Sequence, residues 1–151
     1  MDRENQADAL LRRALSFIAA SETLVGRQEQ GYLISSLLLQ GFAAELIAKK
    51  RLYEESAKTE EVEQTEKRLR SEPYAHNILK MWRDYTDFLS EALSIDSTFE
   101  KHFIALDSAH TKATKYAIRY GGEMDTPDPR VIAPVLKEII RRERMRRASA
   151  Q

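Results

Sequence analysis

The chain has 151 residues, of which 42% are hydrophobic and 32% are charged, which is typical of a single globular domain and excludes a disordered chain. Its 24 lysines and arginines balance 24 aspartates and glutamates, so the overall charge does not point to nucleic acid or to a membrane surface. The absence of cysteine excludes disulfides, cysteine nucleophiles and thiolate metal sites.

The first predicted element is a helix over Arg3 to Val25, in which apolar residues recur at helical spacing. Gly26 supplies a stop signal directly after it. The N-terminal sequence "MDRENQADALLRR" is too polar for a secretory signal peptide, which needs an apolar core. We therefore expect a cytoplasmic protein.

The second predicted helix covers about Glu29 to Ala57 and is apolar nearly all round. Its most apolar stretch, Gly31 to Ala48, contains Gln40 and Glu45 and barely reaches the length of about 20 residues that a bilayer requires. We interpret it as the central helix of a bundle rather than as a membrane span.

A charged segment, Glu54 to Pro73, follows with almost no large apolar residues. Two interpretations fit it, a helical extension or a mobile loop, and in either one its charges are expected to form a solvated face. Pro73 ends the segment because proline breaks a helix.

Three further helices are predicted, the third over His76 to Leu93 and the fourth over Ser97 to Tyr120. Ser97 and Glu100 have the spacing of a capping box. Asp128 is predicted to cap the fifth helix, with Pro129 at its first position. The pattern predicts one all-α domain over residues 1–151, an up-and-down bundle of four main helices with an extra C-terminal helix.

Glu45 is a candidate site residue, because its apolar neighbours predict burial. A buried carboxylate needs a cation or hydrogen-bond donors. Lys49, four residues later, is placed to pair with it along the helix, and Arg119 is a candidate partner from another helix. Two interpretations remain, a structural ion pair or a site where Glu45 and Arg119 orient a ligand.

Other candidate sites are weaker. Asp107 and His110 have the spacing to share a metal with another helix, but a polar surface pair looks the same. Arg146 and Arg147 end the last predicted helix, either as solvated cations that complement its dipole or as a phosphate-binding patch. Our site prediction contains no metal and no other cofactor.

Three stretches together resemble HEPN domains, the higher eukaryotes and prokaryotes nucleotide-binding family. "AAELIAKKRLY" (Ala43 to Tyr53) resembles the second helix of the family, and "AHNILKMW" (Ala75 to Trp82) resembles the start of its third helix. "KYAIRYGGE" (Lys115 to Glu123) resembles the arginine-tyrosine-proline motif that ends the fourth, with Gly121 where proline is usual.

The resemblance implies a small helical domain, commonly a homodimer, that belongs among ribonucleases, partners of minimal nucleotidyltransferases or non-catalytic nucleotide and RNA binders. Our leading hypothesis is a non-catalytic binding or regulatory module for a nucleotide, RNA or a nucleotidyltransferase-type partner, with no membrane association. Its ligand-binding residues would be Glu45, Lys49, His76, Arg119 and Tyr120.

Two alternatives follow. The ribonuclease members use an arginine and a histidine four to six residues apart, and Arg70 and His76 have this spacing. A toxin-like endoribonuclease that uses this pair is the first alternative. A structural assembly protein with no small ligand is the second.

Overall fold

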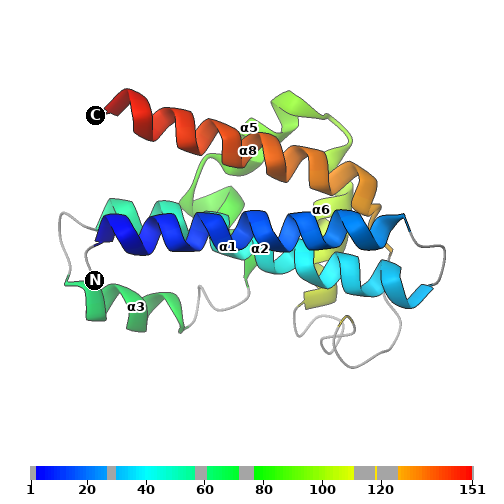
Figure 1. Ribbon diagram of the computed structural model, residues 1–151, viewed down its shortest axis with the longest axis horizontal. Helices are drawn as coiled ribbons and strands as arrows, with labels where there is room; N and C mark the ends of the chain where they lie inside the picture. The colour runs from blue at the N-terminus through cyan, green and yellow to red at the C-terminus, as the bar shows by residue number, and fades with distance from the viewer. Residues whose placement is uncertain are drawn as a thin grey trace.

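The described part of the chain is helical throughout, without a strand. The computed structural model describes residues 3–26, 30–56, 61–71, 77–110, 118 and 126–150. Figure 1 shows three long helices, α1, α2 and α8, lying side by side, with the shorter elements around them. The predicted all-α class is confirmed.

Helices α1 (Arg3–Val25) and α2 (Gln30–Ser56) form an antiparallel hairpin, and their predicted positions are confirmed within one residue at each end. Every third or fourth residue of α1 faces the core, which explains the periodicity: Ala7, Leu11, Ala14 and Ile18 are all buried. Three alanines of α2 are also fully buried in the core: Ala43, Ala44 and Ala48.

By length and composition, the stretch Tyr32–Ser56 of α2 would be able to cross a membrane, which is weak evidence because core helices pass the same test. Half of its apolar window is buried inside the protein. This burial fits the predicted central helix, while the absence of a membrane and the cytoplasmic location stay predictions.

The charged segment contains a separate helix, α3 (Val62–Leu69). Glu61 begins it with a capping box, because its side chain accepts from the backbone of Gln64, whose own side chain accepts from the Glu61 N–H at 3.2 Å. Leu69 is buried, and Tyr53 of α2 donates a hydrogen bond to Glu66 at 3.4 Å. One face of this segment is therefore packed against α2 rather than solvated.

The third predicted helix is divided, so a continuous helix from His76 to Leu93 is wrong. The chain runs through α4 (Ile78–Lys80), the π-helical turn η1 (Met81–Tyr85) and α5 (Phe88–Ile95). Thr86 ends this helical stretch in an extended backbone conformation, and its hydroxyl donates to the Met81 carbonyl at 2.9 Å.

Trp82 explains why this region is pinned to the core. It lies in η1, is fully buried and donates from Nε1 to the Ala44 carbonyl of α2 at 2.9 Å. Its ring packs on three phenylalanines, with centroid distances of 4.6–5.9 Å: Phe88, Phe99 and Phe103. These contacts hold η1 against the core.

Helix α6 (Phe99–His110) begins two residues after Ser97, so the predicted Ser97 capping box is wrong. The carboxylate of Asp96 organises the preceding turn instead, accepting from the Thr98 N–H at 2.8 Å. The predicted continuation of this helix toward Tyr120 lies largely outside the described residues, and with it the up-and-down arrangement of four main helices stays a prediction.

Helix α8 (Pro129–Ala150) begins as predicted. Asp128 accepts a hydrogen bond from the Arg130 N–H at 2.9 Å, with Pro129 in the first position, where its missing N–H costs nothing. Buried Gln40 of α2 holds this start in place by donating to the Pro129 carbonyl at 3.1 Å.

Candidate functional site

Glu45 and Lys49 lie one turn apart on α2 and form the predicted ion pair. The Lys49 Nζ atom is 2.8 Å from Glu45 Oε1. Glu45 is only 7% exposed and Lys49 is half-buried, so the charges are largely removed from water. The predicted burial of Glu45 and its pairing with Lys49 are both confirmed.

The pair lies between two contacts on the same face of α2. One turn before Glu45, the ring of buried His110 rests directly on Gly41, where a Cβ atom would lie 1.9 Å from His110 Nε2. One turn beyond Lys49, Tyr53 contacts α3. Residues spaced four apart share a helix face, so Gly41, Glu45, Lys49 and Tyr53 form one line that leads from α6 to α3.

The other predicted ligand-binding residues, His76, Arg119 and Tyr120, lie outside the described residues, and their position near Glu45 stays a prediction. Arg70 is described and is exposed just beyond the last turn of α3, where its backbone N–H bonds to the Glu66 carbonyl at 3.2 Å. The Arg70–His76 pair of the ribonuclease alternative also stays a prediction.

Asp107 and His102, two polar residues of α6, serve as hydrogen-bond acceptors for neighbouring chain segments. Asp107 accepts from the Leu79 N–H at 3.0 Å at the start of α4, and burial raises the pKa of its carboxyl although these backbone bonds oppose the shift. His102 Nδ1 accepts from the Asp128 N–H at 3.0 Å. Across the described residues, no group of three potential metal ligands occurs, with or without Asp107 and His110.

A network of charged side chains that the sequence analysis missed joins α2 to α8. Glu143 of α8 is 2% exposed and lies 3.1 Å from Nζ of Lys50, which is fully buried. It also forms an ion pair with Arg51, whose Nη1 reaches Asp87 before α5 at 2.8 Å. The network is therefore a structural clamp on three parts of the chain.

Arg146 belongs to the same network. Its guanidinium lies 2.8 Å from Glu54 and 3.2 Å from Glu143. Lys50 also pairs with Glu54, at 2.9 Å. With Asp87 included, the network therefore contains three cations and three carboxylates. Arg146 forms structural ion pairs in it and is not simply a solvated cation at the end of the helix.

The electrostatics of Glu143 follow from its partners. Burial acts to raise the pKa of this carboxyl, but hydrogen bonds from Arg51 and Arg146 outweigh burial and hold the pKa at about 2. Burial likewise acts to lower the pKa of Arg51, but the bonds to Glu143 and Asp87 outweigh it and raise the pKa. Both groups stay charged across the physiological range.

This pKa predicts an acid-dependent loss of stability. Glu143 has a pKa of about 2 when folded, against 4.5 ordinarily, so the unfolded chain binds the proton more tightly. Its contribution is fully present above about pH 4.5 and is lost as the pH falls toward 2. Urea unfolding of the wild type between pH 6 and 3 should show this loss, and Glu143→Gln should flatten the dependence; parallel curves for both proteins would contradict it.

Comparisons of the chain with protein-family models, with curated proteins and with solved structures give no significant match.

Proposed function

We propose that the protein is a helical binding module, non-catalytic in itself, for an anionic ligand of the nucleotide or RNA class. The observation that carries the proposal is the largely buried Glu45–Lys49 pair on the central helix, with a Lys49 ammonium that bonds to Glu45 at 2.8 Å. The resemblance to HEPN domains supports the choice of ligand, because the three resembling stretches include this pair, His76 and Arg119.

The chemistry of Lys49 is suited to an anion. A lysine ammonium has three N–H donors. Glu45 takes one of them, and no other described residue takes the remaining two. Water screens this half-buried ammonium less than it screens a solvated lysine, so the donors that no described residue takes are suited to a phosphate, although the Glu45 carboxylate offsets part of the attraction. In this proposal Glu45 holds Lys49 in position, and Lys49 and Arg119 bind the phosphate.

The proposal extends to the assembly. A homodimer and a nucleotidyltransferase-type partner are part of it on the resemblance alone. A cytoplasmic location is a separate part of the proposal that does not rest on the resemblance. None of them is needed for the ligand test that follows, which uses the purified chain.

Lys49→Met should weaken ligand binding about tenfold to a hundredfold, because a hydrogen bond to a charged group contributes about 1.5–3 kcal/mol. The measurement is the melting temperature with a panel of nucleotides and short RNAs. A ligand at one hundred times its Kd adds about 2.7 kcal/mol to the stability of the wild type.

The matched control is Lys101→Met, which removes an exposed lysine of α6 and should leave binding unchanged. Lys49→Arg keeps the positive charge and should restore most of the response, which separates a lost ligand contact from a damaged fold. Equal responses of Lys49→Met and wild type would exclude Lys49 from the site. A panel with no response at all would overturn the proposed ligand class.

A further inference from the structure

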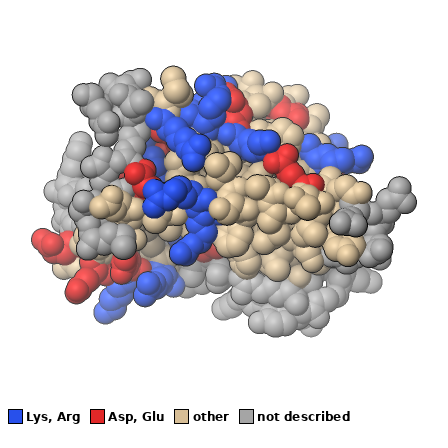
Figure 2. All heavy atoms as spheres, viewed as in Figure 1, with Lys and Arg blue, Asp and Glu red and all other residues tan. Residues whose placement is uncertain are grey.

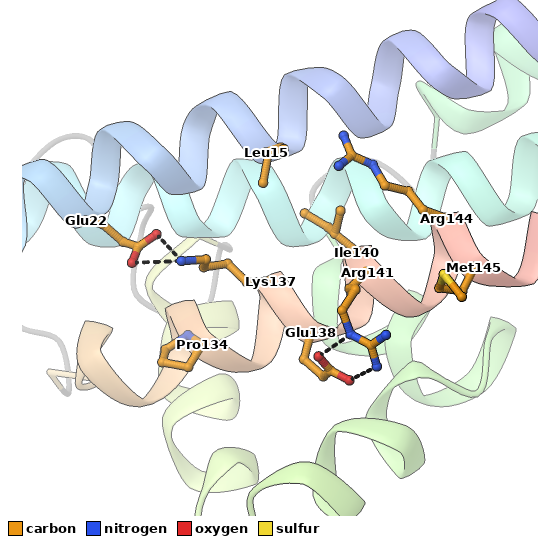
Figure 3. A pocket seen from close by; sticks show the side chains of 9 residues that line it. All are labelled: Leu15, Glu22, Pro134, Lys137, Glu138, Ile140, Arg141, Arg144 and Met145. Atoms are coloured by element: carbon orange, nitrogen blue, oxygen red, sulfur yellow. Dashed lines mark hydrogen bonds and ion pairs between the residues drawn. The ribbon is translucent and has the colours of Figure 1, made fainter.

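A groove of about 590 Å³ runs along the outer side of the molecule between α1 and α8, on different residues from the Glu45–Lys49 pair. Figure 3 shows its lining side chains, which come from these two helices alone. The apolar part is formed by Leu15 of α1 and by Pro134, Ile140 and Met145 of α8. Met145 is 58% exposed, which is unusual for a large apolar side chain.

Charged side chains line the rim of this groove. Near one end, Lys137 of α8 pairs with Glu22 of α1 at 3.2 Å, and farther along Arg141 pairs with Glu138 at 2.6 Å. Arg144, near the other end, also lines the groove and has no ion-pair partner among the described residues. Within the part of the chain that the structure describes, this guanidinium beside exposed apolar surface is open to a carboxylate from a partner.

The outer surface of α8 is basic although the whole chain is neutral. Figure 2 shows basic side chains gathered over this helix. Of its two acids, Glu143 is buried in the clamp and Glu138 pairs with Arg141, while acids outside the helix offset other cations, such as Glu22 for Lys137. The cations of the helix up to residue 146 are Arg130, Lys137, Arg141, Arg142, Arg144 and Arg146.

We propose that this groove docks an acidic amphipathic helix of a partner protein. A third helix fits against two antiparallel helices, and the stretch from Pro134 to Met145 is about 16 Å long at 1.5 Å per residue, or three turns. Its apolar face would cover Leu15, Pro134 and Met145, and its carboxylates would meet Arg144 and the neighbouring cations.

The charge and shape of the groove favour this occupant over two others. In a symmetric dimer the same patch meets itself, so the basic face of α8 would lie against a second basic face. Single-stranded nucleic acid binds on aromatic rings between cations, whereas none of the 9 side chains that line the groove is aromatic. The apolar lining and Arg144, for which no described residue is an ion-pair partner, fit an acidic helix.

The probe is a synthetic three- to four-turn peptide with leucine at helical spacing and glutamate elsewhere. Two control peptides share its design, one scrambled to break the apolar face and one with lysine for glutamate. Binding is followed by fluorescence anisotropy and by the methyl resonances of 13C-labelled methionine. The Met145 signal should shift on titration, while the fully buried Met81 of the core should not.

Arg144→Glu should weaken binding of the acidic peptide about tenfold, and the lysine peptide should bind this variant better than it binds the wild type. The control variant is Arg13→Glu, an equal charge change at an exposed residue of α1 two positions from Leu15 and so on another face. It should leave binding unchanged, as should Lys49→Met, because the groove and the proposed nucleotide site are separate.

Several results would overturn the proposal. Equal binding of the scrambled peptide, or equal losses in Arg144→Glu and Arg13→Glu, would reduce the effect to general charge attraction. A dimer in sedimentation equilibrium that Met145→Asp dissociates would make a second copy the occupant. Displacement of the acidic peptide by a short RNA, with Met145 as the affected methyl, would assign the groove to nucleic acid.

Discussion

Glu143→Gln should lower the free energy of unfolding by about 3 kcal/mol, the lower end of the cost of breaking a buried ion pair, because Lys50 and Arg51 lose their shared carboxylate and keep Glu54 and Asp87 as partners. Lys50 is fully buried and Arg51 nearly so, and Glu143 lies at the centre of both pairs. Glutamine keeps the shape of the side chain but not its charge, so the loss reports the electrostatic clamp. Urea unfolding at neutral pH measures it.

The matched control is Glu138→Gln, the same change one turn earlier on the same helix. Glu138 is more exposed and pairs with Arg141 and Arg142 at the surface. Exposed pairs contribute about 0–1 kcal/mol, so this variant should unfold almost like the wild type. Equal losses in both variants would show that α8 tolerates neither change and that the buried clamp has no special role.

Gly41→Ala should destabilise the protein by about 1–3 kcal/mol, as overpacking of a core does, despite the better helix propensity of alanine. A Cβ atom at residue 41 would lie 1.9 Å from Nε2 and 2.4 Å from Cε1 of the His110 ring. The ring is buried and packs at an edge-on angle against Phe42, so it has little room to move. Thermal or urea unfolding gives the value.

Gly26→Ala is the control for this change, because the nearest atom to a Cβ there is the Thr23 carbonyl oxygen at 3.9 Å. It should be nearly neutral. Combining Gly41→Ala with His110→Ala should remove most of the additional cost, since the two residues are coupled by a single clash. Additive losses in the double variant would place the cost of Gly41→Ala somewhere other than the ring of His110.

Local sequence signals predicted the parts of the fold that depend on neighbours along the chain. The apolar periodicity and Gly26 predicted both ends of α1 correctly. Asp128 and Pro129 predicted the first residue of α8. The Glu45–Lys49 pair could also be predicted from the sequence, because both residues lie on one helix at the spacing that brings their side chains together.

Long-range contacts explain the errors. Trp82 is held by Ala44, 38 residues away, and together with Thr86 this contact divides a helix that the local pattern makes continuous. Glu143 stands in the sequence "RRERMRR", which looks solvated, yet its cations lie 92 and 93 residues earlier. Only the packing of α8 on α2 shows that this acid is buried.

This separation along the chain has a consequence for biosynthesis. A ribosome makes Lys50 and Arg51 long before Glu143, so the α1–α2 hairpin can form from local contacts while its buried cations still lack their carboxylate. Until then the buried Lys50 has Glu54, four residues later on the same helix, as its ion-pair partner, and Glu143 is still missing. Arrival of α8 supplies Glu143 to both cations, so completion of this buried network depends on the synthesis of α8.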